Sequence, residues 1–193
     1  MRTRPRDGSE ASPGIPVYIL AGGKSRRYGS DKARADADGV SMIVRVADAL
    51  KPFARSVTVV AAKSGEYDDL DLRTIGDITP DKGPMGGLLT ALEDDGAAGW
   101  IFLSACDWQG IRSRWVERLL SGRRAGRGVV AFQSDRYDPL LAAYHGSILS
   151  VVAEHIERHR LEMQELLSSV NTHGIPHPAD WHRAVNVNRP DEH

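Results

Sequence analysis

Short apolar, β-rich runs alternate with helical segments along this chain, and this alternation restricts its fold more than any other feature. Residues 15–21 (IPVYILA), 56–62 (SVTVVAA) and 100–105 (WIFLSA) are typical of strands buried on both faces of a sheet. A helix is predicted over residues 41–51, where Ser41 can cap its start. Strands that alternate with helices favour a mostly parallel sheet, so we predict an α/β fold.

The other elements follow from the same patterns. Glycines at 83–87 (GPMGG) predict a tight loop that opens a helix through Leu92. Further strands are predicted at 73–76, 128–133, 140–144 and 185–187, and further helices at 114–120, 147–158 and 161–169. The first 14 residues are rich in Arg, Pro, Gly and Ser, so we expect a disordered extension followed by one domain over residues 15–193.

Composition limits the classes of partner. The formal net charge of −1 is unlike the strong basic excess of duplex-binding proteins, so nucleic acid is not the expected partner. The single cysteine, Cys106, rules out an internal disulfide and fits a reducing compartment, so we expect a cytoplasmic protein. No apolar run approaches the roughly 18 residues that span a membrane, so no membrane partner is expected.

Residues 20–32 (LAGGKSRRYGSDK) form the first candidate for a chemical site. Glycines directly after a buried strand let the backbone approach a phosphate chain with its N–H groups turned inward. Lys24, Arg26, Arg27 and Lys32 add four positive charges, as a loop that neutralises a polyphosphate requires. An ordinary glycine turn with solvated charges is the alternative.

Two aspartates follow predicted strands. Asp107 lies just past the strand at 100–105, where open α/β sheets bind ligands, and its carboxylate could hold Mg²⁺. Asp77 follows the short strand at 73–76 and could accept hydrogen bonds from a nucleoside. The alternatives are a helix-capping role for Asp107 and a turn-forming role for Asp77.

Other polar and glycine-rich segments are less specific. The glycines at 83–87, Gly86 among them, indicate close approach by a ligand or by a neighbouring strand. Asn186 and Asn188 alternate on a predicted strand and could bind a polar ligand such as a pterin, or could simply mark the strand end. The histidines at 155 and 159 lack further metal ligands, and those at 173, 177 and 182 are expected in a solvated loop.

Taken in order, these segments resemble the molybdenum cofactor guanylyltransferase family and its wider nucleotidyltransferase relatives. The family motif L-A-G-G-x-S-x-R-M-G-x-D-K is matched at residues 20–32, with Tyr28 in place of Met. The family also has an Asp before a G-P-x-x-G-L loop, a strand ending in C-D, a P-L-x-x-x-Y element and a closing N-V-N-x-P. These are matched by Asp77 and residues 83–88, 106–107, 139–144 and 186–190, and the resemblance covers about residues 15–191.

The resemblance implies a three-layer Rossmann-like nucleotidyltransferase fold with a mostly parallel sheet. It implies that GTP and Mg²⁺ lie over the first loop, that Asp77 contacts the nucleoside and that Asp107 holds the metal. Catalytic roles are implied for Lys32, Asp107 and Arg26. Contacts with the substrates are implied for Leu20, Ala21, Gly22, Gly23, Ser25, Lys32, Asp77, Gly86, Asn186 and Asn188.

The implied reaction transfers GMP from GTP to the phosphate of molybdopterin, with pyrophosphate as the product and transient contact with molybdenum cofactor assembly proteins. Two departures leave alternatives open. Val60 stands where the family commonly has an Asn that holds guanine, and Trp108-Gln109 replaces the usual continuation to Pro after C-D. The alternatives are transfer from CTP to molybdopterin, transfer to a sugar or polyol phosphate, and a nucleotide-binding adaptor without catalysis.

Overall fold

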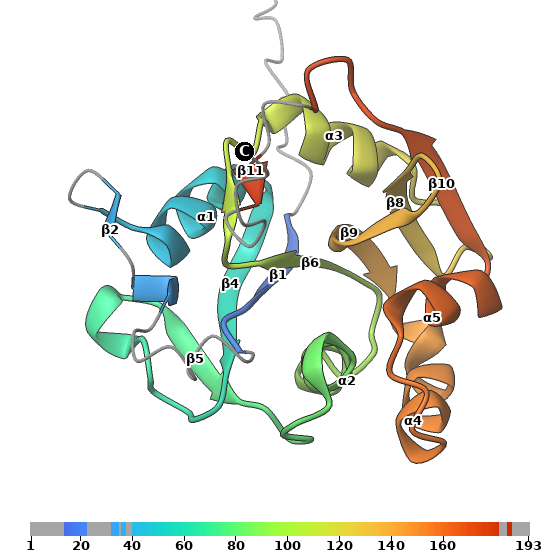
Figure 1. The fold of residues 1–193 in the computed structure, drawn as a ribbon, viewed down its shortest axis with the longest axis horizontal. Coiled ribbons are helices and arrows are strands. Elements are labelled where there is room, and N and C mark those ends of the chain that lie inside the picture. Colours follow the sequence, from blue (N-terminus) through green and yellow to red (C-terminus); the bar gives the residue numbers. More distant parts are fainter. Residues whose placement is uncertain (1–13, 23–31, 35, 38–39, 182–184, 187–193) are drawn as a thin grey trace, which may run out of the picture.

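A seven-stranded sheet forms the middle layer of the structure (Figure 1). This computed structural model describes residues 14–22, 32–34, 36–37, 40–181 and 185–186, with the backbone alone at 32, 36–37 and 185–186. The strand order is β10-β8-β9-β6-β1-β4-β5. The strands are β1 (Ile15–Leu20), β4 (Ala54–Ala61), β5 (Arg73–Gly76), β6 (Trp100–Ala105), β8 (Val129–Gln133), β9 (Tyr137–His145) and β10 (Thr172–Pro176).

Within this sheet, β9 runs antiparallel to its neighbours β6 and β8, and every other pairing is parallel. The sheet is therefore mixed and mostly parallel, which confirms the predicted fold class. Two short ribbons lie outside it. They are formed by β2 (Asp36–Ala37) with β3 (Val40–Ser41), and by β7 (Trp108–Gln109) with β11 (Val185–Asn186).

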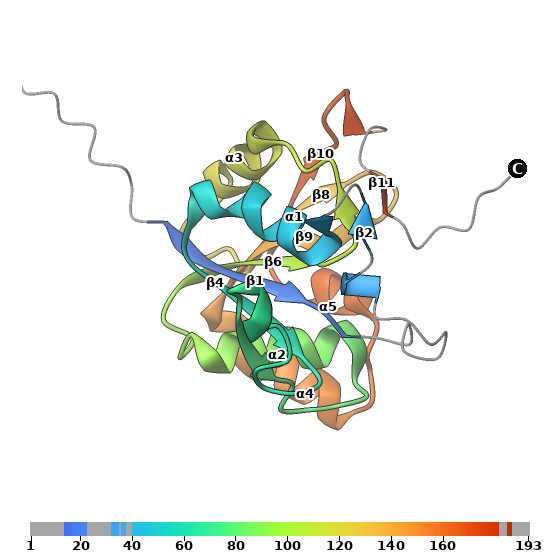
Figure 2. The same ribbon diagram turned by 90° about the vertical axis from the view of Figure 1, so that its left-hand side faces the viewer.

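Helices cover both faces of the sheet. The helices are α1 (Met42–Leu50), α2 (Gly83–Asp94), α3 (Ser113–Ser121), α4 (Leu149–Glu157) and α5 (Met163–Ser169), with 3₁₀ turns η2 (Lys32–Arg34), η3 (Lys51–Phe53), η4 (Asp68–Leu70) and η5 (Gly146–Ile148). Figure 2 shows α1 and α3 on one side of the sheet and α2 and α4 on the other. None of the described helices is long and apolar enough to cross a bilayer.

Alternate side chains of β1 supply the two halves of the core. Val17 and Ile19 pack in the cluster that includes residues of α1 and α3, whereas Tyr18 and Leu20 pack in the cluster that includes residues of α2, α4 and α5. Successive side chains of a strand point to opposite faces, so one apolar strand can hold two helical layers together. This explains why residues 15–20 are buried without interruption.

A charged cluster attaches the end of α2 to the sheet. Arg73 donates two hydrogen bonds of 2.8 Å to Asp94, and the Tyr18 hydroxyl donates a third of 2.7 Å. Hydrogen bonding from Arg73 holds the pKa of Asp94 below its ordinary value. Burial, reinforced by the bond to Asp94, raises the pKa of Tyr18. The cluster therefore joins β1, β5 and α2.

Several local predictions need correction. The glycine-rich stretch at 83–87 is the first turn of α2 rather than a loop that precedes it. Ser41 occupies the N-cap position of α1, but its side chain makes no capping hydrogen bond. The predicted loop around His173 is wrong, because residues 172–176 form β10, an edge strand whose Gly and Pro hide it from sequence patterning. The predicted N-terminal extension and domain limits stay predictions, since residues 1–13 lie outside the described part.

We expect Gly146→Ala to destabilise the fold. A Cβ atom at Gly146 would lie 2.2 Å from the carbonyl oxygen of Ala97, and backbone cannot move aside as a flexible side chain can. Overpacking of this kind typically lowers the free energy of unfolding by about 1–3 kcal/mol. Urea denaturation measures the change. Gly99→Ala is the matched control because its Cβ would meet nothing within 4 Å, so equal losses in both variants would contradict the packing argument.

Candidate functional site

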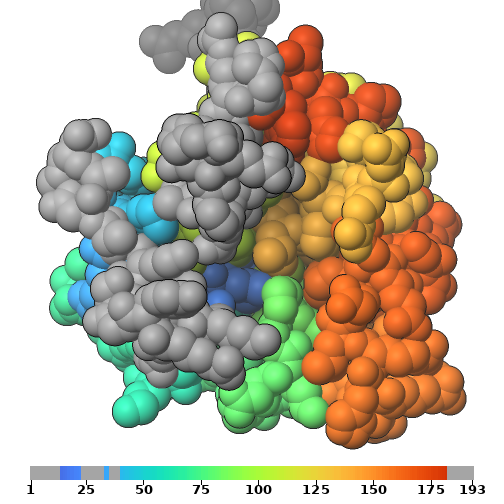
Figure 3. Space-filling view, in the orientation of Figure 1, coloured from blue at the N-terminus to red at the C-terminus, as the bar shows by residue number. Residues whose placement is uncertain are grey.

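The carboxyl ends of β1, β4, β5 and β6 meet at one edge of the sheet, which faces the viewer in Figure 1. The chain order reverses at β1, since β4 and β5 extend to one side and β6 to the other. In open α/β sheets, ligands bind outside the carboxyl ends of the strands at such a reversal. In the space-filling view, β1 (blue) is visible between α2 (green) and the gold segment that follows β8 (Figure 3).

Backbone hydrogen bonds continue past the strand ends and hold the predicted site residues at this edge. The Cys106 N–H donates to the Leu20 carbonyl (3.1 Å), and the Asp77 N–H donates to the Ala61 carbonyl (2.7 Å). The predicted residues Leu20, Ala21, Gly22, Asp77 and Asp107 are therefore brought to one edge, although the sequence separates them by up to 87 positions (107 − 20).

Gly22 is exposed, and a Cβ atom there would meet nothing within 4 Å. Packing of the described residues therefore does not require glycine at this position, which fits close approach by a ligand. The predicted contacts Gly23, Ser25 and Arg26 lie outside the described residues. Lys32 begins η2, and only its backbone is described.

Arg34 attaches η2 to the loop around η4, an interaction that sequence reasoning missed. Its guanidinium donates to both carboxylate oxygens of Asp69 (2.7 and 2.8 Å) and to the Glu66 carbonyl (2.6 Å), and it lies 5.0 Å from the centre of the Tyr67 ring. The hydrogen bond from Arg34 lowers the pKa of Asp69. This contact holds the turn that carries Lys32, and no local signal predicts it because its partners lie more than 30 residues away.

Asp77 forms the turn that leads into α2. Its Oδ1 atom accepts hydrogen bonds from the Thr79 N–H (2.9 Å) and the Thr90 hydroxyl (3.0 Å), and the same hydroxyl accepts from the Ile78 N–H (3.1 Å). The turn-forming role is therefore present in the structure. These contacts use one carboxylate oxygen, so the predicted contact between Asp77 and a nucleoside stays a prediction that involves the other, Oδ2.

The glycines of α2 let this helix lie close to neighbouring segments of the same chain. A Cβ atom at Gly86 would lie 2.7 Å from the Thr79 carbonyl oxygen, and one at Gly87 would lie 2.7 Å from the Leu20 side chain. Of the two roles considered for these glycines, packing against a neighbouring segment is the one that the structure shows. Val60 packs on the same side, buried in the core cluster with Leu20 and Met85.

Asp107 is the buried carboxylate of this edge, with 7% of its surface exposed. The residue that follows it begins β7 and not a helix, so the alternative role as a helix cap is wrong. Carboxylate oxygen suits Mg²⁺, which commonly binds one or two carboxylates together with waters and substrate phosphates. A buried carboxylate at this edge therefore suits a metal site shared with a substrate. Among the described residues, no group of three His, Cys, Asp or Glu side chains could cage a metal by itself.

The β7–β11 ribbon brings the end of the chain beside Asp107. Asn186 pairs with Trp108 in antiparallel register, although 78 positions separate them (186 − 108). Trp108 is buried, donates from its indole nitrogen to the Leu140 carbonyl (2.7 Å) and packs against Trp181 at 5.3 Å between ring centres. Trp108 and Gln109, which stand where the family usually continues to Pro, therefore form one strand of this ribbon. Asn188, which is predicted to contact a substrate together with Asn186, lies outside the described residues.

Two histidines differ from the prediction of a solvated loop. His173 lies in β10, and the His177 ring nitrogen Nε2 is within hydrogen-bond distance of the Asp138 carboxylate. His177 also stacks on Trp181, with 4.8 Å between ring centres. His155 is buried and contacts the Ser169 hydroxyl at 3.3 Å. His177 and Trp181 belong to an aromatic group with Trp108, Trp115 and Phe132 that holds the segment after β10 against the sheet.

The reversed strand order and the residues at its edge are those of an open α/β protein that binds a ligand at the carboxyl ends of its strands. The MobA-like NTP transferase domain matches residues 17–173, and the chain belongs to this family of nucleotidyltransferases. It is 32% identical to a probable molybdenum cofactor guanylyltransferase of Flavobacterium johnsoniae, over 92% of this chain and 94% of that protein. The molybdenum cofactor guanylyltransferase of Yersinia pestis is 27% identical over 92% of both chains.

Solved structures agree with the fold. Molybdopterin-guanine dinucleotide biosynthesis protein A of Archaeoglobus fulgidus superposes with a TM-score of 0.71 at 24% identity, over 84% of this chain and 83% of that one. A protein of Aquifex aeolicus superposes with a TM-score of 0.76 at 19% identity, over 94% of this chain and 97% of that one. The family resemblance and the three-layer fold inferred from the sequence are both confirmed.

We expect Thr90→Val to loosen the turn at Asp77. The buried Thr90 hydroxyl connects the Asp77 carboxylate, the Ile78 N–H and the Gly86 carbonyl, and valine keeps the shape without the hydroxyl. The loss of these bonds should lower the free energy of unfolding by about 1–2 kcal/mol in urea denaturation. Thr90→Ser keeps the hydroxyl and serves as the control. Equal stability of the Val and Ser variants would show that the hydroxyl does not support the turn.

Proposed function

We propose that this chain transfers GMP from GTP to the terminal phosphate of molybdopterin and releases pyrophosphate, as a step of molybdenum cofactor biosynthesis. The names of the relatives support this reaction. The observation that supports it best is the pairing of Asn186 with Trp108, because it lies next to the buried carboxylate of Asp107. The segment proposed to contact the acceptor and the residue proposed to hold Mg²⁺ are thus neighbours.

The reaction needs no strong general base. A phosphate monoester has a second pKa of about 6, so the attacking oxygen of the acceptor is already anionic at neutral pH. The obstacle is the approach of two polyanions. In our proposal, Lys32 and Arg26 offset the phosphate charges and the N–H groups of Gly22 and Gly23 hydrogen-bond to the phosphate oxygens. Asp107 would hold Mg²⁺, which when bound supplies further positive charge at the phosphates.

The nucleoside would lie over the end of β4 and β5. The Asp77 carboxylate has its Oδ1 atom occupied by the turn, and we assign Oδ2 to a hydroxyl or N–H of the nucleoside. Val60 is buried and its side chain is apolar, so this side chain offers a base no hydrogen bond. This observation favours, as the second candidate, a cytidylyltransferase that acts on molybdopterin, because the Asn that commonly holds guanine is absent here.

The test of the reaction is pyrophosphate release by the purified protein with molybdopterin and Mg²⁺, with GTP, CTP, ATP and UTP supplied separately. Release with GTP alone is the expected result, and release with CTP alone would establish the second candidate. A folded protein that binds a nucleotide without any release would point to a sugar or polyol phosphate as acceptor. Failure with those acceptors as well would identify a nucleotide-binding adaptor.

Two variants test the proposed catalytic roles. Lys32→Ala should lower kcat by about 10²–10³-fold, because one preorganised positive charge at the phosphates is lost. Asp107→Ala should remove Mg²⁺-dependent turnover. Lys51→Ala is the control, since Lys51 is exposed and pairs with Asp48 at 2.8 Å. Near-wild-type kcat in either test variant would overturn the role assigned to that residue.

A further inference from the structure

A basic groove lies between the C-terminal end of α3 and the edge strand β10. Figure 1 shows these two elements near each other at one end of the sheet. The volume of the groove is about 360 Å³. We use the name basic groove for the surface formed by Arg118, Ser121, Gly122, Arg124, Arg127 and residues 173–176. Its turn at 122–128 leads into the start of β8, which is parallel to β10, so this turn lies at the amino edge of the sheet and away from Asp107.

The arginines of the basic groove differ from most other described arginines in that they form no ion pair with a carboxylate. Seven described arginines form ion pairs with carboxylates, namely Arg34, Arg55, Arg73, Arg112, Arg114, Arg158 and Arg160. Within the described residues, Arg118, Arg124 and Arg127 form no such pair. The basic groove therefore brings together three arginines that have no carboxylate partner among the described residues.

Helix capping explains only part of this arrangement. Arg124 donates to the carbonyls of Ser121 (2.6 Å) and Arg123 (2.7 Å), and Arg127 donates to that of Gly122. Cations at a helix C-terminus interact well with its free carbonyls. A guanidinium has five N–H donors, however, and each of these bonds uses a single nitrogen, Nη1. Donors therefore stay available in both side chains for an anionic ligand.

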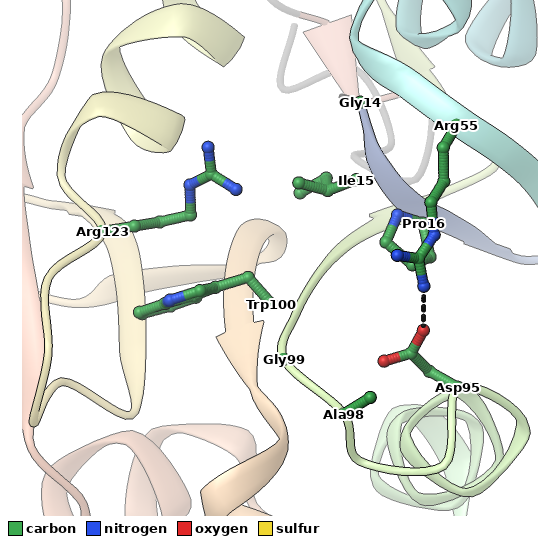
Figure 4. Close-up of a pocket in the computed structure, with 9 residues that line it drawn as sticks. All are labelled: Gly14, Ile15, Pro16, Arg55, Asp95, Ala98, Gly99, Trp100 and Arg123. Carbon is green, nitrogen blue, oxygen red and sulfur yellow. Dashed lines mark hydrogen bonds and ion pairs between the residues drawn. The ribbon is translucent and has the colours of Figure 1, made fainter. Parts of the chain in front are cut away.

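The positive charges of the groove act on the imidazole of His173. Burial lowers the pKa of its imidazole, and the charges of Arg127 and Arg124 lower it further. At neutral pH the groove therefore combines three positive charges with a neutral imidazole. A second hollow, lined by Arg55, Asp95 and Arg123 among others, has a smaller excess of positive charge. Arg123 points into that hollow, of about 210 Å³, but there Asp95 pairs with Arg55 at 2.9 Å (Figure 4).

Among the described residues, the strand that borders the groove has a neighbour on one side only. β10 is the last strand of the sheet there, and its one described partner is β8. Half of the backbone N–H and C=O groups of an edge strand point outward, where an extended peptide can hydrogen-bond to them as an added strand. A second copy of this chain is a poor occupant, because pairing of two β10 strands would bring two sets of uncompensated arginines together.

We propose that the basic groove binds an extended acidic segment of a partner protein, which adds a strand to β10 and places its carboxylates on Arg118, Arg124 and Arg127. Arginine suits this role because its planar fork binds a carboxylate through two parallel hydrogen bonds. A nucleic acid would use the arginines but not the open strand edge. The groove lies away from the nucleotide edge, so a partner could stay bound during turnover, and its binding does not depend on the proposed reaction.

The test uses the full chain and a fluorescein-labelled Glu-Val repeat peptide, with binding measured by fluorescence anisotropy at low salt. The double variant R124E/R127E should weaken binding by more than about tenfold, because two attractive charges become repulsive. The control R158E/R160E changes two arginines of the α4–α5 region that already pair with Glu154 or Glu165. It should bind as the wild type does.

Two further probes separate the outcomes. A version of the peptide with N-methylated backbone should bind at least several-fold more weakly, since it cannot donate to β10. In the unmodified chain, the peptide should shift the His173 imidazole resonances in NMR spectra, which requires no variant to fold. Equal affinity of R124E/R127E, unchanged His173 signals, or tighter binding of a single-stranded oligonucleotide than of the peptide would each overturn the proposal.

Discussion

The burial of β1 is the constraint on which the rest of the structure depends. This strand is hydrogen-bonded on both sides, to β4 and β6, and its side chains supply both halves of the core. The carboxyl end of β1 lies where the chain order reverses, with β4 on one side and β6 on the other. The same burial that stabilises the middle of the molecule therefore sets the position of the glycine turn and of the edge to which ligands bind.

Close packing next to β1 determines how this edge is built. Gly87 lets α2 approach the Leu20 side chain, and Gly86 lets it approach the turn at Thr79. That turn is held by the bonds between Asp77 and Thr90, so the carboxylate at the end of β5 is oriented by the packing of a helix. Asp77, which is proposed to contact the substrate, is thus oriented by residues that only pack. A substitution at Gly86, Gly87 or Thr90 would therefore change the position of the Asp77 carboxylate.

Among the described residues, the arginines at the two edges of the sheet differ in whether they pair with carboxylates. At the carboxyl edge, Asp107 is buried and the described arginine nearest in sequence to the glycine loop, Arg34, is paired with Asp69. At the amino edge, the turn after α3 carries arginines without carboxylate partners in the described structure, next to an edge strand. The net charge of −1 gives no sign of this difference, because it does not record which charged groups pair with one another.

The sequence by itself determined the class of fold, most of the strands and the family, because burial on both faces and helical periodicity are local patterns and the motifs occur in order. It also identified Asp77 and Asp107 as the acids at strand ends. Only the tertiary structure decided that Asn186 lies beside Trp108, that Arg34 holds Asp69, that residues 172–176 form an edge strand and which arginines lack carboxylates. The physical reason is that these features are contacts between residues far apart in the chain, and the free energy of such contacts depends on packing that no local pattern contains.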